Sequence, residues 1–263
     1  MGRRKRETIT ITMTNSKVKV SVKVNVILTA VVLSMLCACQ YGSVDNEQDT
    51  KDSDSAVIHI AVLPTEECRP FYVAQQRGLF DSLGVEVKLD TFLAAMDADT
   101  AFMNNKVQLL MSDSLKAHYL NSFVKRDSIT SIITDTLRLS VMTGKPTRIK
   151  AISSLKEKII AVTRNSALDY FADQTMDKAG IKREYLNRPQ INNISLRADM
   201  LNLNQYDGAI LPEPFATQCE EQGAYRINSM KAPLMRVLVK KSVMKKRKQD
   251  IERIIEAYWR VKG

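Results

Sequence analysis

Four short polar segments of this chain carry the side chains that are best suited to hold a small charged or polar molecule. Each segment follows a short apolar run and precedes a stretch with helical periodicity. Because the carboxyl ends of neighbouring strands meet at one edge of an α/β sheet, we expect the four segments to share a crevice. The candidate ligand-binding residues are Pro64, Thr65, Arg69, Ser112, Asp113, Thr163, Arg164, Asn165, Ser166 and Glu213.

The segment 163–166 (TRNS) is the strongest of these candidates. It opens a predicted helix at Ala167, where unpaired backbone N–H groups and the positive end of the helix dipole favour anionic groups. The alternative is an ordinary helix cap with Arg164 in solvent. Ser112 and Asp113 leave a similar choice open, because they could either contact a ligand or only cap the next helix.

The segment 64–69 has conflicting charges. Arg69 lies beside a helix start predicted at Pro70, and it could clamp a carboxylate or sulfonate with two parallel hydrogen bonds. Glu66 and Glu67 oppose this interpretation, because two carboxylates repel an anion. A solvated loop in which Arg69 pairs with one of the two glutamates is the alternative.

No catalytic or metal-binding pattern accompanies these segments. His59 lies in a predicted strand and His118 on a predicted helix, far apart in the sequence, and no Cys/His cluster has metal-ligand spacing. We therefore predict no catalytic residue, no metal ion and no cofactor. Of the four cysteines, Cys68 and Cys219 are expected to be free or buried.

From Val57 onward, short β-branched apolar runs alternate with amphipathic helical stretches, which predicts an α/β architecture with mostly parallel strands. Strands are expected at 58–63, 85–89, 109–111, 131–134, 137–142, 159–162, 208–211 and 235–239. Helices are expected near 70–77, 95–104, 115–121, 167–179, 214–222 and 249–261.

The order and spacing of several segments resemble the NMT1/THI5-like periplasmic substrate-binding proteins, a group that includes alkanesulfonate, taurine, nitrate and pyrimidine-precursor binders. The segments that carry the resemblance are 62–65, 70–80, 84–87, 97–113, 152–180 and 206–223, and together they span nearly all of residues 57–240. The resemblance implies an α/β fold of the two-lobed type II periplasmic-binding-protein class, with a ligand cleft between the lobes. It also implies that Glu213 lies at or near the cleft, where it accepts from a ligand amine or holds the lobes in register. A structural role, in which Glu213 pairs with a neighbouring arginine or with backbone N–H groups, is the alternative.

Extended segments that link the two blocks of strands are expected to form hinge crossings near 139–145 and 231–236. Lobe 1 would then comprise residues 57–140 and 235–263, and lobe 2 residues 145–230. Members of the resembled family usually continue for further helices, whereas this sequence ends soon after Trp259.

The residues before the predicted domain indicate export. A mostly apolar run, 26–39, follows a basic segment and ends in Leu-Cys-Ala-Cys, as in a secretory signal, and a cysteine directly after Leu-x-Ala resembles the lipobox of bacterial lipoproteins. The run is shorter than the roughly 20 residues needed to cross a bilayer, although a membrane anchor is the alternative. We predict a signal peptide at 1–38, with Met1 or Met13 as the start, lipidation at Cys39 and an acid-rich tether at 39–56.

The charge of the whole chain is misleading for function. The net charge is +10, but removing residues 1–38 leaves 32 basic and 28 acidic residues, a net charge of +4. No dense basic stripe interleaved with aromatic residues remains except at 240–248, which we interpret as a solvated helix face, with contact to anionic lipid or a partner as the alternative. We therefore expect no nucleic-acid partner.

Together these features predict a monomeric lipoprotein of the bacterial cell envelope, anchored to a membrane through its lipid and facing the periplasm or the cell exterior. It would bind a small molecule such as a sulfonate, nitrate or an aminopyrimidine and deliver it to an ABC permease and ATPase. An enzyme on the same fold and a surface lipoprotein without transport are the alternatives. The candidates mix two arginines with acidic residues, which favours a zwitterionic or neutral-polar ligand.

Overall fold

The computed structural model describes residues 8–9, 22–23, 56–124 and 128–263. The chain divides into two units, residues 1–53 and 54–263. In the first unit, β1 (Thr8–Ile9) and β2 (Val22–Lys23) pair antiparallel. The rest of the predicted signal peptide, the predicted lipidation site Cys39 and the tether up to residue 55 lie outside the described residues.

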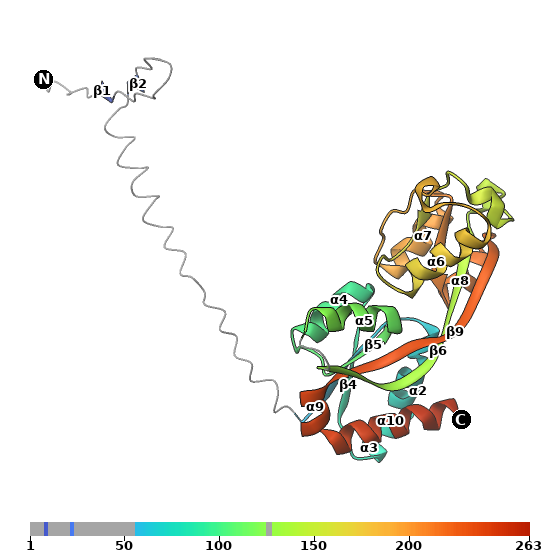
Figure 1. Cartoon of the computed structure of the whole chain (residues 1–263). Helices are drawn as coiled ribbons and strands as arrows, with labels where there is room; N and C mark the ends of the chain where they lie inside the picture. The colour runs from blue at the N-terminus through green and yellow to red at the C-terminus, as the bar shows by residue number, and fades with distance from the viewer. Residues whose placement is uncertain (1–7, 10–21, 24–55, 125–127) are drawn as a thin grey trace, which may run out of the picture. The chain divides into compact units, whose positions relative to one another are not determined.

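Two long strands run through both lobes of the second unit (Figure 1). They are β6 (Ile129–Thr143) and β9 (Tyr225–Lys240), which pair antiparallel at the centre of a seven-stranded sheet with the order β4-β3-β5-β9-β6-β8-β7. The shorter strands of the sheet are β3 (Ile58–Val62), β4 (Val87–Thr91), β5 (Leu109–Asp113), β7 (Ile160–Ala161) and β8 (Gly208–Pro212).

The expectation of mostly parallel strands is wrong for this sheet. The pairs β3–β4, β3–β5 and β7–β8 are parallel, but β5–β9, β6–β8 and β6–β9 are antiparallel. The predicted strands 131–134 and 137–142 are parts of the single strand β6. The break that the sequence suggested, at Asp135 and Thr136, falls where the pairing register of β6 with β9 shifts, between Asp135 and Leu137.

Six helices of the described residues surround β3, β4 and β5 in the first lobe. They are α2 (Arg69–Gln76), α3 (Leu79–Ser82), α4 (Ala95–Met103), α5 (Ser114–Ser122), α9 (Lys241–Lys246) and α10 (Lys248–Lys262). Successive side chains of β3 face opposite sides of the sheet, and helices cover both sides. Ile60 and Val62 pack in the cluster that includes α2 and α10, whereas Ala61 packs in the cluster that includes α4 and α5.

The helices of the second lobe are α6 (Ala167–Lys178), α7 (Ile194–Asn202) and α8 (Phe215–Glu221). Side chains cap the first residues of two of them, since Ser166 accepts from Leu168 N and Asn193 accepts from Leu196 N. Helix α7 was not expected from the sequence, nor were α3, α9 and the first half of β9. Within the described part of the chain, no helix has the length and apolar character needed to cross a bilayer.

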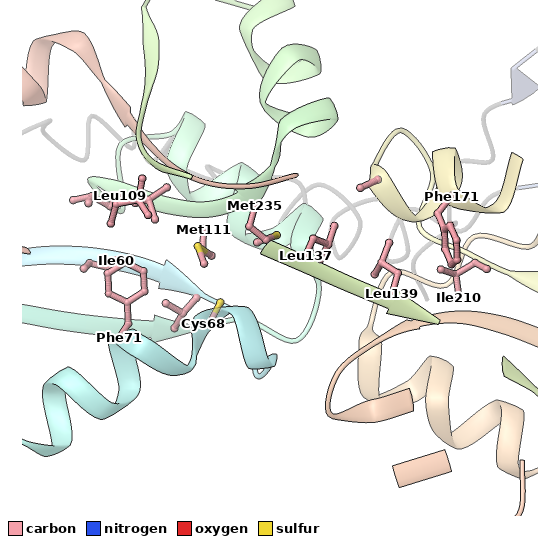
Figure 2. Close-up of a cluster of buried hydrophobic side chains, with 14 of the residues drawn as sticks. Ile60, Cys68, Phe71, Leu109, Met111, Leu137, Leu139, Phe171, Ile210 and Met235 are labelled. Carbon is pink, nitrogen blue, oxygen red and sulfur yellow. The ribbon is translucent and has the colours of Figure 1, made fainter. Parts of the chain in front are cut away.

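The largest buried cluster continues from one lobe into the other. Figure 2 shows Met111 and Met235 beside Leu137 of β6, and, two residues further along that strand, Leu139 beside Phe171 and Ile210. This continuity makes β6 a shared part of both cores. Cys68 and Cys219 are free and buried, as the sequence predicted.

Candidate functional site

Residues from both lobes line a cavity of about 60 Å³. The residues come mainly from the ends of strands and the beginnings of helices, where the backbone turns from one element to the next. The apolar part of the lining comprises Leu63, Ala95, Met111, Leu137, Leu168, Ile194, Pro212 and Met235. The polar part comprises Thr65, Glu67, Ser112, Asp113, Lys116, Thr163, Ser166, Asn192 and Arg197.

The structure brings five of the ten predicted site residues to this cavity. Thr65 and Ser112 are buried in the first lobe, and Asp113 follows Ser112 at the start of α5. Thr163 and Ser166 are buried in the second lobe before α6. Each of the five lies where a predicted strand gives way to a loop or a helix, which is why the sequence pattern placed them at one edge of the sheet; ligand contact by them stays a prediction.

The other predicted residues of the segments 64–69 and 163–166 do not line the cavity. Arg69 is exposed and pairs with Glu66 at 2.9 Å between Nη1 and Oε1, which is the alternative that the sequence left open. Arg164 is exposed, and its Nη2 donates to the Arg188 carbonyl at 3.0 Å. Pro64 is partly buried, and Asn165 is exposed with a left-handed backbone (φ +53°).

Glu213 also lies outside the cavity lining. Its Oε1 accepts from Arg226 Nη1 at 2.5 Å, and its Oε2 accepts from the Thr217 hydroxyl at 2.8 Å. Pairing with a neighbouring arginine is the structural alternative to ligand contact that the sequence left open for it. Ligand contact by Glu213, Arg164, Asn165, Arg69 or Pro64 stays a prediction.

Two carboxylates line the cavity from the first lobe. Glu67 is buried, and its Oε1 accepts from the Arg138 backbone N–H at 3.1 Å. Burial raises the pKa of Glu67, although hydrogen bonds from the Arg138 N–H and the Thr65 hydroxyl oppose this. In the sequence Glu67 was considered only as a charge that repels anions or pairs with Arg69.

Asp113 is the second carboxylate, and it caps α5 in the first lobe. Its Oδ1 caps α5 by accepting from Leu115 N at 3.0 Å and Lys116 N at 2.9 Å. The backbone N–H of Ala167, the first residue of α6 in the second lobe, also favours the charged form of the carboxyl and so lowers its pKa. Burial raises the pKa of Asp113, and these backbone hydrogen bonds oppose the rise.

Arg197 of α7 is the positive side chain that the sequence reasoning missed. It is fully buried (0% exposed), and its Nε donates to the Ile210 carbonyl at 3.0 Å while its Nη1 donates to Thr163 Oγ1 at 2.7 Å. Its Nη2 is buried without a hydrogen-bond partner. Burial lowers the pKa of Arg197 to about 10. A cap residue, Asn193, followed by a helical pattern was the only signal that could have indicated it.

Lys116 is the other positive side chain in the lining, and it has an acidic partner. Its Nζ lies 3.1 Å from Asp99 Oδ2, and both side chains are nearly buried. Burial raises the pKa of Asp99 to about 6, and the charge of Lys116 opposes that rise. The charge of Lys116 is therefore largely compensated inside the protein.

Backbone hydrogen bonds hold the lobes together around the cavity. Ile194 N donates to the Leu93 carbonyl at 2.9 Å, and Glu66 N donates to the Glu213 carbonyl at 2.9 Å. Ala94 and Asn193 form an isolated antiparallel bridge beside the first of these bonds. The structure is thus closed over the cavity.

A larger hollow of about 420 Å³ lies within the first lobe, lined by Asp90, Phe92, Asp97, Thr100, Ala101, Asn104, Lys106 and Val107. No residue of the second lobe lines it, so closing the lobes would not change its contacts. In this hollow, Asp90 Oδ2 lies 2.6 Å from His59 Nδ1, which is hydrogen-bond distance. We take the smaller cavity as the candidate site because polar groups from both lobes converge there. Among the described residues, no group of His, Cys, Asp and Glu side chains is arranged to hold a metal ion.

The two lobes, the strands that they share and the cavity between them define a type II periplasmic-binding-protein fold. The NMT1/THI5 like family model matches residues 66–224, which is more than half of the chain, and the chain belongs to this family. No curated protein sequence matches it significantly.

Solved structures of periplasmic binding proteins share this fold at low sequence identity. The alkanesulfonate-binding protein SsuA from Xanthomonas axonopodis pv. citri, bound to MOPS, has a TM-score of 0.68 at 12% identity, covering 80% of this chain and 74% of that one. The aliphatic sulphonate binding protein SsuA from Escherichia coli has a TM-score of 0.63 at 10% identity, covering 79% and 72%. The nitrate-binding protein NrtA from Synechocystis has a TM-score of 0.71 at 10% identity, covering 79% and 61%.

Proposed function

We propose that this protein is the solute-binding lipoprotein of an ABC importer and that it captures a small polar molecule outside the cytoplasm. The observation that carries the proposal is the cavity whose polar lining comes from both lobes. Membership of the NMT1/THI5 like family and the similarity in fold to sulfonate- and nitrate-binding proteins support it.

Closure of the lobes over the solute is the physical basis of this function. A ligand that touches Thr65 and Asp113 in one lobe and Thr163 and Ser166 in the other makes its full set of contacts only when the lobes are closed. Such a ligand stabilises the closed state by its differential affinity for that state. The closed form is then the one offered to the permease.

The hinge of this motion is proposed where β6 and β9 have no third strand beside them. Leu137 pairs with Ala232 and Arg138 with Lys231, beyond the end of the β5–β9 pairing at Met235 and before the β6–β8 pairing begins at Leu139. The sequence-based crossings at 139–145 and 231–236, and the lobe bounds that follow from them, stay predictions.

Attachment to a membrane is proposed from the sequence alone. Cys39 follows Leu-x-Ala at the end of a short apolar run, which supports cleavage before it and acylation of its thiol. A lipid anchor and the acidic tether would keep the binding domain near the permease.

A ligand screen by thermal unfolding tests the binding function. Sulfonates, nitrate, aminopyrimidines and aromatic carboxylates are added singly to the purified domain, residues 54–263. A true ligand at a hundred times its dissociation constant stabilises the folded state by about 2.7 kcal/mol. If no compound of any class raises the unfolding temperature, the proposed binding function is wrong.

A further inference from the structure

The charged side chains in the cleft cavity do not balance one another. Lys116 is paired with Asp99, which leaves Glu67, Asp113 and Arg197 as the charged lining residues without an ion-pair partner in the described ranges. A ligand that fills the cavity must therefore complement two carboxylates and one guanidinium.

The environment of Arg197 indicates that the ligand carries an anionic or strongly accepting group. Its guanidinium is fully buried, its donated hydrogen bonds go to carbonyl and hydroxyl oxygens, and Nη2 has no acceptor. A buried cation without a counter-charge and with an unpaired donor is costly, because it has lost its hydration without full replacement. An anionic oxygen in the cavity would supply both missing interactions.

The environments of Glu67 and Asp113 indicate that the same ligand also carries a cationic group. Both carboxylates accept hydrogen bonds from backbone N–H groups, yet neither has a positively charged partner within ion-pair distance in the described residues. A plain anion would therefore meet two negative charges, one buried at Glu67 and one partly buried at Asp113.

We propose that the ligand is a small zwitterion, with an ammonium group held by Glu67 beside Asp113 and a carboxylate or sulfonate held by Arg197. This inference rests on the proposed binding function and specifies its ligand class. The volume of 60 Å³ is about four times what a single water molecule needs, so the ligand has only a few non-hydrogen atoms.

Two pairs of compounds test the need for the ammonium group. Propionate is β-alanine without its amino group, and ethanesulfonate is taurine without its amino group. Isothermal titration should show that at least one zwitterion binds the domain 10-fold or more tightly than its deaminated partner. The comparison of β-alanine with taurine tells whether Arg197 receives a carboxylate or a sulfonate.

The variant Glu67→Gln tests whether Glu67 holds the ammonium group of the ligand, and Glu66→Gln is its matched control. The glutamine side chain keeps the size and the acceptor for the Arg138 N–H but loses the charge, so zwitterion binding should fall at least 10-fold while binding of the deaminated partner rises. Glu66 does not line the cavity, and its variant should bind within 2-fold of the wild type. Thermal unfolding without ligand verifies that both variants fold.

These experiments distinguish a failure of the zwitterion proposal from a failure of the proposed binding function. Equal or tighter binding of propionate and ethanesulfonate, or unchanged zwitterion binding by Glu67→Gln, overturns the zwitterion proposal and leaves the binding function intact. The same holds if none of these four compounds binds while another compound of the broader screen does. If no compound of either set binds, the proposed function itself fails.

Discussion

Arg226 is the residue that organises the turn after β8. Its Nη1 donates to Glu213 Oε1 at 2.5 Å, and its Nε donates to Glu220 Oε2 at 3.0 Å. Burial alone would raise the pKa of Glu213, but hydrogen bonds from Arg226 and Thr217 hold it below its usual value. The ionised carboxylate therefore stabilises the folded state.

Glu213→Gln should lower the free energy of unfolding by about 1–2 kcal/mol at pH 7, as expected for a lost hydrogen bond to a charged group in a partly exposed pair. The pKa of Glu213 is lower in the folded state than in the unfolded state. The variant should therefore show its full loss of stability above about pH 4.5, and the difference from the wild type should shrink as the pH falls through the folded-state pKa. Urea unfolding between pH 7 and pH 3 measures it.

Glu221→Gln is the matched control for Glu213→Gln. Glu221 is exposed at the end of α8, the helix that follows Glu213, and its variant should change stability by less than about 0.5 kcal/mol. An equal loss in both variants, or a loss that persists undiminished at low pH, would contradict the role given to the Arg226–Glu213 pair.

Single residues of the site differ in how well the sequence reveals them. Thr65, Ser112 and Ser166 could be predicted because small polar residues after an apolar strand mark a sheet edge. Lys116 and Arg197 could not, because a lone basic residue in a helical stretch looks like a solvated side chain. Their burial arises only from the packing of α5 and α7 against other elements, which the local pattern does not contain.

At the scale of elements, α10 packs against the first lobe through the buried residues Ile251, Ile254, Ala257 and Tyr258. Tyr258 is fully buried, its ring centroid lies 5.1 Å from that of Phe71 in α2, and its hydroxyl donates to Asp135 of β6. Trp259, the next residue, is 45% exposed. The helix therefore braces both α2 and the central strand next to the proposed hinge.

Tyr258→Ala should destabilise the domain by about 3–5 kcal/mol, because it leaves a cavity between α10 and α2 and removes the hydrogen bond to Asp135. Trp259→Ala should cost about 0.5 kcal/mol or less. Chemical denaturation of both variants provides the comparison. Similar losses in the two would mean that α10 does not pack as described.

A disulfide between Ala94→Cys and Asn193→Cys should lock the lobes closed. Bridge partners on antiparallel segments have Cα atoms about 4.5–5.5 Å apart, which suits a disulfide. We expect the oxidised double variant to take up and release a ligand at least 10-fold more slowly than the reduced form. Cys68 and Cys219 are buried and should not interfere.

The Ala94→Cys single variant is the control for the lock, since it cannot form the bond. Ligand exchange that is equally fast in the oxidised and reduced double variant would show that the lobes do not have to open. Stopped-flow fluorescence or rapid mixing with calorimetric detection measures the exchange.

Elements with strong local patterns were predicted from the sequence, and elements that depend on the rest of the fold were not. Helices α2, α4, α5, α6, α8 and α10 all fall within a few residues of the expected ranges. The first half of β9 was missed because residues 225–234 lack a continuous apolar pattern and include Pro233. Its extended form comes from pairing with β6, which is distant in the sequence.

At the scale of the whole molecule, attachment to a membrane depends on the predicted lipidation at Cys39. Cys39→Ser should move the protein from the membrane fraction to the soluble fraction and abolish labelling with a fatty-acid analogue, because the acylated thiol is lost. Cys37→Ser, two residues earlier, should leave both unchanged, since Cys37 would be removed with the leader. Full membrane attachment of Cys39→Ser would contradict the lipoprotein proposal.

The most direct test of solute binding between the lobes is a crystal structure of the domain with a compound that stabilises it. We predict electron density for the compound in the cavity lined by Thr65, Asp113, Thr163 and Arg197, in contact with both lobes. Density in the hollow beside Asp90 and Asp97, or contacts with one lobe only, would contradict this account.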